Sequence, residues 1–156
     1  MGLRVRKRSG PAIPPMDAGT YAAVCVGVVD LGEQYSETFK KYSDKVLLIW
    51  EIPSQTVEVD GEQKPRWLSK DFAQSLNEKS NLYKFLLPWR GREFTQEELD
   101  GGYDLRELLG TGCLLSVTVG EHDDGSKFNK IAAVIGLPEG LPAPSTQTER
   151  IAFDLD

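Results

Sequence analysis

The sequence predicts a mainly β domain, a five-stranded and partly open barrel whose helices are inserted between the third and fourth strands. Runs of apolar and β-branched residues have the length of strands, turn residues separate them, and apolar residues at helical spacing are concentrated in the middle of the chain. With 156 residues, the chain is long enough for one domain with a hydrophobic core. We therefore expect one folded domain, over residues 20–137.

The first two strands are expected near the beginning of this domain. Residues 21–31 are rich in valine and end at a glycine, and residues 46–52 repeat the pattern and stop at a proline. Trp50 lies within the second apolar run and is expected in the core. The polar stretch between the two strands, residues 33–44, also carries three aromatic side chains and is expected to be an exposed connection.

A hairpin and a helical segment are predicted next. Residues 55–59 and 66–70 flank an Asp60-Gly61 pair, which supplies the positive φ angles that a tight turn needs. Residues 77–87 have apolar residues at helical spacing and end before a proline, so they predict a helix. Thr95, followed by two glutamates, predicts the start of a second short helix.

The rest of the chain completes the domain and its flanks. Residues 104–109 predict a third helical turn. Residues 113–119 and 128–135 predict two strands joined by an Asp-Asp-Gly turn. Glycines and prolines in residues 1–19 predict a flexible, basic arm. Residues 138–156 predict a Pro-rich linker and a short acidic tip.

The predicted order is two strands, a hairpin strand, a helical connection and two more strands. It is the order of the OB-fold, a five-stranded, partly open barrel whose face commonly binds oligonucleotides. A generic α+β domain has a similar order, so the order alone leaves that alternative open.

Basic and aromatic residues alternate between residues 64 and 94, although the chain has a net charge of -6. Cations bind a phosphate backbone through counterion release, and flat rings stack on unpaired bases, so the pattern is typical of a surface for single-stranded nucleic acid. The alternative is that the rings are core and the charges are the solvated face. The expected backbone contacts are Lys40, Lys41, Lys64, Arg66, Lys70, Arg90 and Arg92, and the expected stacking residues are drawn from Tyr35, Phe39, Tyr42, Trp67, Phe72 and Trp89.

The charges divide unevenly along the chain. Residues 1–92 carry 14 Lys and Arg against 11 Asp and Glu, whereas residues 93–156 carry 4 against 13. This asymmetry indicates an interaction surface in the first part and an acidic remainder.

Several short motifs lie between residues 69 and 110. They are Ser69-Lys-Asp-Phe72, Ser75-Leu-Asn-Glu-Lys-Ser80, Leu82, Trp89-Arg-Gly-Arg92, Phe94-Thr-Gln-Glu-Glu-Leu99, Tyr103-Asp-Leu105 and Leu108-Leu-Gly110. With these motifs the chain resembles, over about residues 20–138, a family of small bacteriophage and prophage replication proteins regarded as OB-fold single-stranded DNA-binding proteins. The resemblance implies a phage or prophage origin and a role in DNA replication or recombination, and it assigns no binding residues one by one.

The C-terminal segment carries a second resemblance. Many bacterial and phage single-strand binders are similar in ending with a flexible linker and an acidic tip that contains an aromatic residue and docks onto replication partners. The partner-binding residues that this resemblance implies are Phe153, Asp154, Leu155 and Asp156. A frayed end without a role is the alternative.

No catalytic or cofactor signature is recognised. His122 is the single histidine and lies on a predicted turn, so no metal site and no Ser-His-Asp arrangement is expected. Cys25 and Cys113 lie in apolar strands and are expected to be buried thiols of a reducing compartment. Because no apolar run has the length of a membrane span and the basic start lacks a signal peptide's apolar stretch, we expect a cytoplasmic protein of a bacterial host cell, without enzymatic activity, metal, cofactor or membrane contact.

Two functions therefore remain. The first is a sequence-tolerant single-stranded DNA-binding protein that acts in phage or prophage replication or recombination. The alternative is a non-enzymatic protein-interaction adaptor on the same fold, whose acidic second half binds a basic partner. The sequence leaves open whether the chain forms a homo-oligomer, how long its binding site is and whether it prefers DNA to RNA.

Overall fold

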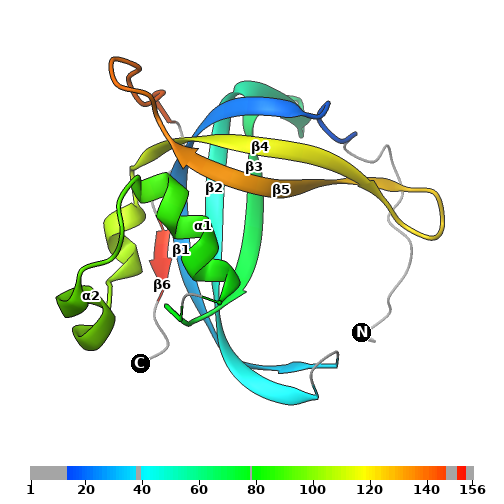
Figure 1. Cartoon of the computed structure of the whole chain (residues 1–156). Helices are drawn as coiled ribbons and strands as arrows, with labels where there is room; N and C mark the ends of the chain where they lie inside the picture. The colour runs from blue at the N-terminus through cyan, green and yellow to red at the C-terminus, as the bar shows by residue number, and fades with distance from the viewer. Residues whose placement is uncertain (1–13, 38–39, 78, 147–150, 154–156) are drawn as a thin grey trace.

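The computed structural model describes residues 14–37, 40–77, 79–146 and 151–153 (Figure 1). The strands are β1 (Gly19–Ser36), β2 (Lys41–Val59), β3 (Glu62–Ala73), β4 (Gly112–Glu121), β5 (Lys127–Gly136) and β6 (Ile151–Phe153). Between β3 and β4 lie α1 (Asn81–Arg90), α2 (Gln96–Gly101) and the 3-10 turn η1 (Leu105–Leu108). The prediction of a mainly β chain with helices between the third and fourth strands is confirmed.

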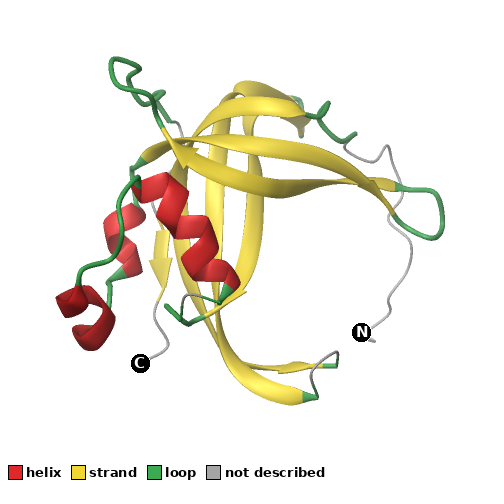
Figure 2. Ribbon diagram, in the orientation of Figure 1, coloured by secondary structure: helices red, strands yellow, loops and turns green. Residues whose placement is uncertain are grey.

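The strands form one curled sheet in the order β3-β2-β1-β4-β5, with antiparallel neighbours, and β6 pairs with β1 in parallel. The edge strands β3 and β5 approach each other, but the described residues show no backbone pairing between them. The sheet is therefore not closed into a barrel. Figure 2 shows the helices gathered on one side of the curled sheet.

The first hairpin is longer than predicted. Residues up to Ser36 of β1 pair with residues from Lys41 of β2, and Tyr35 lies opposite Tyr42. The two rings meet edge to face with centroids 5.0 Å apart. The described residues between 33 and 44 are mostly exposed, as expected, but they form the end of a hairpin rather than a connection, because cross-strand aromatic pairs of this kind extend a hairpin beyond its apolar run.

The second hairpin turns where it was predicted to turn. Asp60 and Gly61 have φ angles of 52° and 81°, and the ladder resumes at once between Val59 and Glu62. The Asp-Gly pair therefore sets the register of β2 against β3.

Helix α1 starts and ends later than predicted. The hydroxyl of Ser80 accepts a hydrogen bond from the amide of Tyr83 at 3.2 Å, so the helix starts at Asn81. It continues through Pro88, which was expected to end it, and stops where Gly91 adopts a φ of 72°. Burial of Trp89 holds this last turn in place although Pro88 has no amide hydrogen to donate.

Each of the two shorter helical segments begins at a residue whose side chain caps it. Thr95 caps α2, as predicted, and the structure adds a reciprocal capping box between Thr95 and Glu98. The side chain of Asp104 accepts from the amide of Arg106 and so starts η1. Among the described residues, no helix is both long and apolar enough to cross a membrane.

The core lies inside the curl of the sheet, and α1 packs onto it. Trp50 is fully buried, as expected, and Leu86 of α1 is fully buried with it. The helix approaches β5 so closely that a Cβ added to Gly136 would lie 2.7 Å from the carbonyl oxygen of Trp89. Glycine is therefore needed at this contact between the helix backbone and the sheet.

The folded part extends beyond the predicted domain at both ends. Met16 is 4% exposed and belongs to the core, and β6 joins the sheet. Ala143, in the predicted linker, lies against Gly112 of β4. The predicted boundaries at residues 20 and 137 are therefore too narrow, because both flanks contribute contacts that composition does not reveal. The rest of the predicted arm, residues 1–13, lies outside the described residues.

Replacement of Leu86 by alanine tests the packing of α1 on the sheet. We expect Leu86→Ala to lower the free energy of unfolding by about 2–5 kcal/mol, because it leaves a cavity in the core. Leu99→Ala, at an exposed position of α2, is the matched control and is expected to change it by less than about 0.5 kcal/mol. Urea denaturation followed by circular dichroism measures both, and equal effects would contradict the described packing.

Candidate functional site

A hollow of about 370 Å³ opens where the edge strands β3 and β5 approach each other. Its lining residues are Pro15, Val57, Arg66, Trp67, Leu68, Lys127, Phe128 and Asn129. Trp67 also lines a second hollow, of about 450 Å³, along the β2–β3 hairpin. The indole therefore separates two concave surfaces.

Trp67 is the accessible member of the three tryptophans, all of which the structure describes. It is 47% exposed, whereas Trp50 is fully buried and Trp89 is 5% exposed. Trp67 occupies an outward position of β3, and the next residues on that face, Ser69 and Asp71, are also exposed. Its prediction as a surface ring is consistent with this placement.

Further aromatic surface comes from the β4–β5 hairpin. Phe128 lines the hollow on the side of β5, and the imidazole of His122 lies against it with ring centroids 4.3 Å apart. From the sequence, His122 is expected only on a turn and Phe128 only in a strand. The turn signal at residues 123–125 places both at a hairpin end, but only the curl of the sheet brings that end to Trp67.

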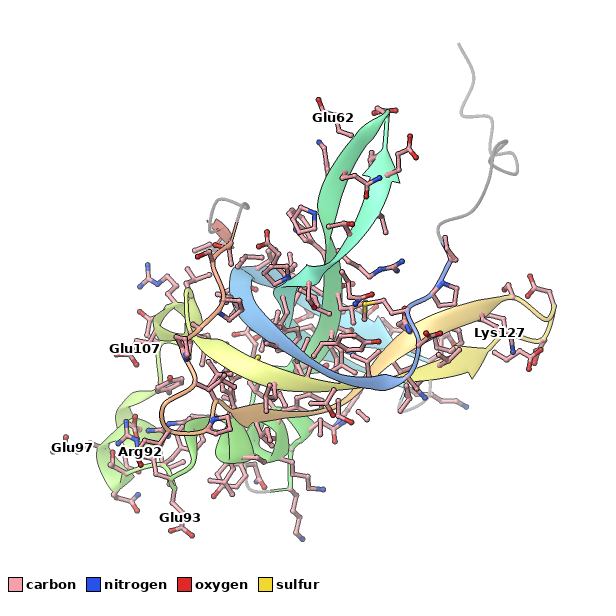
Figure 3. All side chains as sticks on the ribbon, turned by 90° about the horizontal axis from the view of Figure 1, so that it is seen from above. Glu62, Arg92, Glu93, Glu97, Glu107 and Lys127 are labelled. Carbon is pink, nitrogen blue, oxygen red and sulfur yellow. The ribbon has the colours of Figure 1, made fainter. Side chains whose placement is uncertain are left out.

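Cations surround this aromatic surface, and each exposed one has an acidic neighbour. Lys127 lies 3.9 Å from Glu121, and Lys64 lies 4.0 Å from Glu62. Figure 3 shows Glu62 and Lys127 on two projecting hairpins, with the start of the described chain between them. Exposed ion pairs of this kind contribute only about 0–1 kcal/mol each, so a phosphate can replace the carboxylates at little cost.

Arg66 faces the chain segment that precedes β1. Its Nη2 donates a hydrogen bond of 2.6 Å to the carbonyl oxygen of Pro14. Its Nε is buried and has no hydrogen-bond partner among the described residues. A buried donor without a partner is costly, so the hollow beside it favours a ligand or a water that accepts a hydrogen bond.

Four of the predicted residues lie at the opposite end of β2 from this hollow. Tyr35 and Tyr42 are exposed there, beside Lys40 and Lys41. Tyr42 is nine residues from the β2 partner of Trp67, a separation of about 30 Å along a strand. The predicted residues therefore form no single continuous patch, and Phe39 lies outside the described residues.

Two predicted stacking residues are core residues instead. Phe72 is buried and meets Phe85 of α1 edge to face at 5.0 Å. Trp89 packs against Trp50 and donates its Nε1 hydrogen to the carbonyl oxygen of Gly112 at 3.1 Å. Their prediction as DNA-stacking residues is wrong, because α1 buries both rings against the sheet.

Arg90 is also part of the fold rather than of an open surface. Its Nη2 donates to both carboxylate oxygens of Glu98 at 2.9 Å, and its guanidinium lies 4.0 Å from the centroid of Phe94 and 5.0 Å from that of Tyr103. Its side chain is 6% exposed. The prediction of a backbone contact by Arg90 is wrong, because this ion pair joins α1 to α2.

The last two predicted cations lie away from the hollow. The ammonium group of Lys70 lies 5.5 Å from the ring centroid of Phe85, a cation–π contact at the base of α1. Arg92 is exposed but stands with Glu93 and Glu97 on the side of the molecule far from Lys127 (Figure 3). Of the predicted residues, the hollow collects Arg66 and Trp67, and Lys64 lies beside them.

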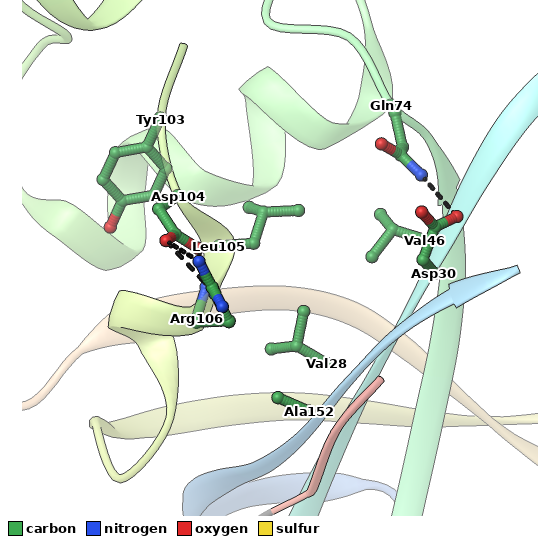
Figure 4. A pocket seen from close by; sticks show the side chains of 9 residues that line it. All are labelled: Val28, Asp30, Val46, Gln74, Tyr103, Asp104, Leu105, Arg106 and Ala152. Atoms are coloured by element: carbon green, nitrogen blue, oxygen red, sulfur yellow. Dashed lines mark hydrogen bonds and ion pairs between the residues drawn. The ribbon is translucent and has the colours of Figure 1, made fainter. Parts of the chain in front are cut away.

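A separate hollow of about 330 Å³ lies between β1, β6 and η1 (Figure 4). Arg106 pairs with Asp104 in its wall, which lowers the pKa of that carboxyl group. Gln74 donates to Asp30 on the other side. None of the predicted nucleic-acid contacts lines this hollow, and it does not contribute to the candidate site.

Neither cysteine has the properties of an activated nucleophile. Both thiols are buried, and burial raises the pKa of Cys25 to about 12 and also raises the pKa of Cys113. In the part of the chain that the structure describes, no three His, Cys, Asp or Glu side chains gather closely enough to hold a metal ion.

The predicted partner-binding tip is only partly described. Phe153 belongs to β6, which pairs with Gly27, Val28 and Val29 of β1. At this residue the expectation of a tip on a flexible linker is wrong, because the backbone joins the sheet, whereas partner binding by Phe153 stays a prediction. Residues 154–156, which carry the rest of the predicted tip, lie outside the described residues.

No family model and no curated protein matches this sequence.

The Arg90–Glu98 pair makes stability depend on pH. The hydrogen bond from the backbone amide of Thr95, and then the hydrogen bonds from the side chain of Arg90, hold the pKa of Glu98 below its ordinary value of 4.5. A lowered folded-state pKa stabilises the protein above the unfolded-state value, and this stabilisation is lost as the pH falls through the folded-state pKa. We expect Glu98→Gln to lower the melting temperature at pH 7.

The difference between Glu98→Gln and wild type should shrink as the pH is lowered from 7 through the folded-state pKa of Glu98, because below that pKa both proteins carry a neutral side chain. Glu97→Gln removes the same charge from the same exposed turn and is the control. Thermal melts across this range measure the effect, and a difference that is constant with pH would show that the carboxylate charge is not responsible.

Proposed function

We propose that this chain is a sequence-tolerant single-stranded DNA-binding protein with an OB-like fold. The strand order β3-β2-β1-β4-β5, with its helical connection between β3 and β4, supports the OB-like assignment. The resemblance of the motifs between residues 69 and 110 supports a role in phage or prophage DNA replication or recombination.

One observation carries the proposal, namely the exposed indole of Trp67 between two hollows, with cations on either side. Arg66 and Lys127 line the same hollow as the indole, and Lys64 lines the other. An unpaired base stacks on an exposed ring with about 1–3 kcal/mol, and neighbouring cations bind the phosphates on either side of that base. The site therefore offers a ring for the base and cations for the phosphates side by side.

The same geometry favours single strands over duplex and tolerates any base. A base in a duplex is already stacked on its neighbours, so it cannot present its face to Trp67 without being unpaired. Stacking uses the π face, which every base has, and phosphate binding does not depend on the base. A ligand bound in this way is recognised as an unpaired strand rather than as a sequence.

Binding of fluorescent oligo-dT and of a duplex of equal length tests the ligand class. We expect preference for the single strand and a log–log salt slope of about -2, since each phosphate contact contributes about -0.7 and three cations border the site. Fluorescence anisotropy at several salt concentrations measures both quantities. Equal affinity for the duplex, or no response to salt, would favour the protein-interaction adaptor instead.

Replacement of Trp67 tests the site. Trp67→Ala is expected to weaken oligo-dT binding by about 1–3 kcal/mol while the melting temperature stays near that of wild type. Leu141→Ala is the control, because Leu141 is also 47% exposed but lies outside the hollow. In the wild type, oligo-dT should protect tryptophan emission from iodide quenching, since only Trp67 is accessible. A variant that binds normally would rule Trp67 out.

A further inference from the structure

The chain segment Pro14–Met16 lies across the gap between β3 and β5. On the side of β3, Arg66 donates to the carbonyl oxygen of Pro14 at 2.6 Å. On the side of β5, the amide side chain of Asn129 accepts from the Met16 amide at 2.8 Å and donates to the Met16 carbonyl oxygen at 3.0 Å. Both edge strands are therefore bonded to the same three residues.

Asn129 binds this segment as a neighbouring strand would. A single carboxamide satisfies the donor and the acceptor of one residue, which are the two groups that a ladder would satisfy. The side chain of Met16 is buried in the core below. The segment is thus held by its backbone and by its side chain.

The docked segment also forms part of the candidate site. Pro15 lines the hollow together with Trp67 and Phe128, and the residues that hold its neighbours, Arg66 and Asn129, line it too. The volume of about 370 Å³ is within the range of pockets for small molecules, roughly 300–1,000 Å³. Without the segment, the hollow would lose one wall and Arg66 would lose the acceptor that orients it.

We propose that the docked segment Pro14–Met16 completes a subsite for one unpaired nucleotide, and that Asn129 is its positioning residue. The base stacks on Trp67 and faces Pro15 and Phe128, and the phosphate is bound by Arg66 and Lys127. Asn129 acts by holding the backbone of Met16 in place, and it brings no charge to the binding site. This inference rests on the proposed binding of single-stranded DNA and adds the element that shapes its site.

Docking of the segment and binding of the strand are then coupled, and thermodynamic linkage makes the coupling reciprocal. DNA must stabilise the docked segment to the same extent that the docked segment strengthens DNA binding. The amide hydrogen of Met16, which is bonded to Asn129, reports the docking directly.

Hydrogen exchange and binding of oligo-dT are measured on the full chain for wild type, Asn129→Ala and Gln74→Ala. Gln74 is the matched control, because its amide also joins two segments, by bonds to Asp30 and to the Lys45 carbonyl oxygen, away from the hollow. In the wild type, oligo-dT should slow exchange at Met16. In Asn129→Ala this amide should exchange faster, and the affinity should fall by about 5-fold or more.

The salt slope separates positioning from direct contact. Asn129→Ala should leave the slope unchanged, since every cation remains, whereas Lys127→Ala should reduce its magnitude by about 0.7. If Asn129→Ala only destabilised the fold, it would lower the fraction of folded protein. In the remaining folded protein, DNA would still slow exchange at the Met16 amide as it does in wild type. The wild-type exchange experiment needs no variant and remains decisive if Asn129→Ala does not fold.

Two outcomes would overturn the inference while the proposed function stands. One is wild-type binding of oligo-dT without any change in exchange at Met16. The other is an Asn129→Ala variant with an undocked segment and normal affinity. If the wild type does not bind oligo-dT at all, the proposed function itself fails.

Discussion

The gap between the edge strands β3 and β5 is the constraint on which the rest of the structure depends. An edge strand exposes unpaired backbone groups, and proteins cover such edges with helices or loops. Here α1 covers one end, where Phe85 meets Phe72 of β3 and the carbonyl of Trp89 approaches Gly136 of β5. The segment Pro14–Met16 covers the other end. Between them the sheet remains curled without a closing ladder.

The candidate site follows from this incomplete closure. A continuous ladder would bring β3 and β5 together at the spacing of paired strands, about 4.8 Å, and would leave no room for a ligand between them. Because side chains cross the gap instead, a hollow forms beside Trp67. In the proposed function, stacking on a ring contributes more than each exposed ion pair, so the rings would set the affinity and the cations would set its salt dependence. Two acidic neighbours, Glu62 and Glu121, pair with Lys64 and Lys127 and weaken the positive potential at the site.

The alternating cations and rings of residues 64–94 have two different roles in the structure. In β3, Trp67 is exposed beside Arg66, and this pair borders the hollow. Beyond β3, the same residue types build the fold: Arg90 joins α1 to α2 through Glu98, and Trp89 fills the core. The interpretation of the rings as core residues is therefore right for Phe72 and for the helical half, and the interpretation as surface residues is right for Trp67.

The sequence by itself determined the class of the fold and the features that depend on adjacent residues. The turn at Asp60-Gly61 and the N-cap at Thr95 are where local chemistry places them, because φ preferences and capping bonds involve only near neighbours. Only the tertiary structure decided which rings are exposed. Trp67 and Trp89 each lie beside an arginine in the sequence, yet one faces outward from an edge strand and the other packs on Trp50. The hydrogen bonds that hold the N-terminal segment against β5 join Met16 to Asn129, which is 113 positions away. No local sequence pattern encodes a partner at that separation.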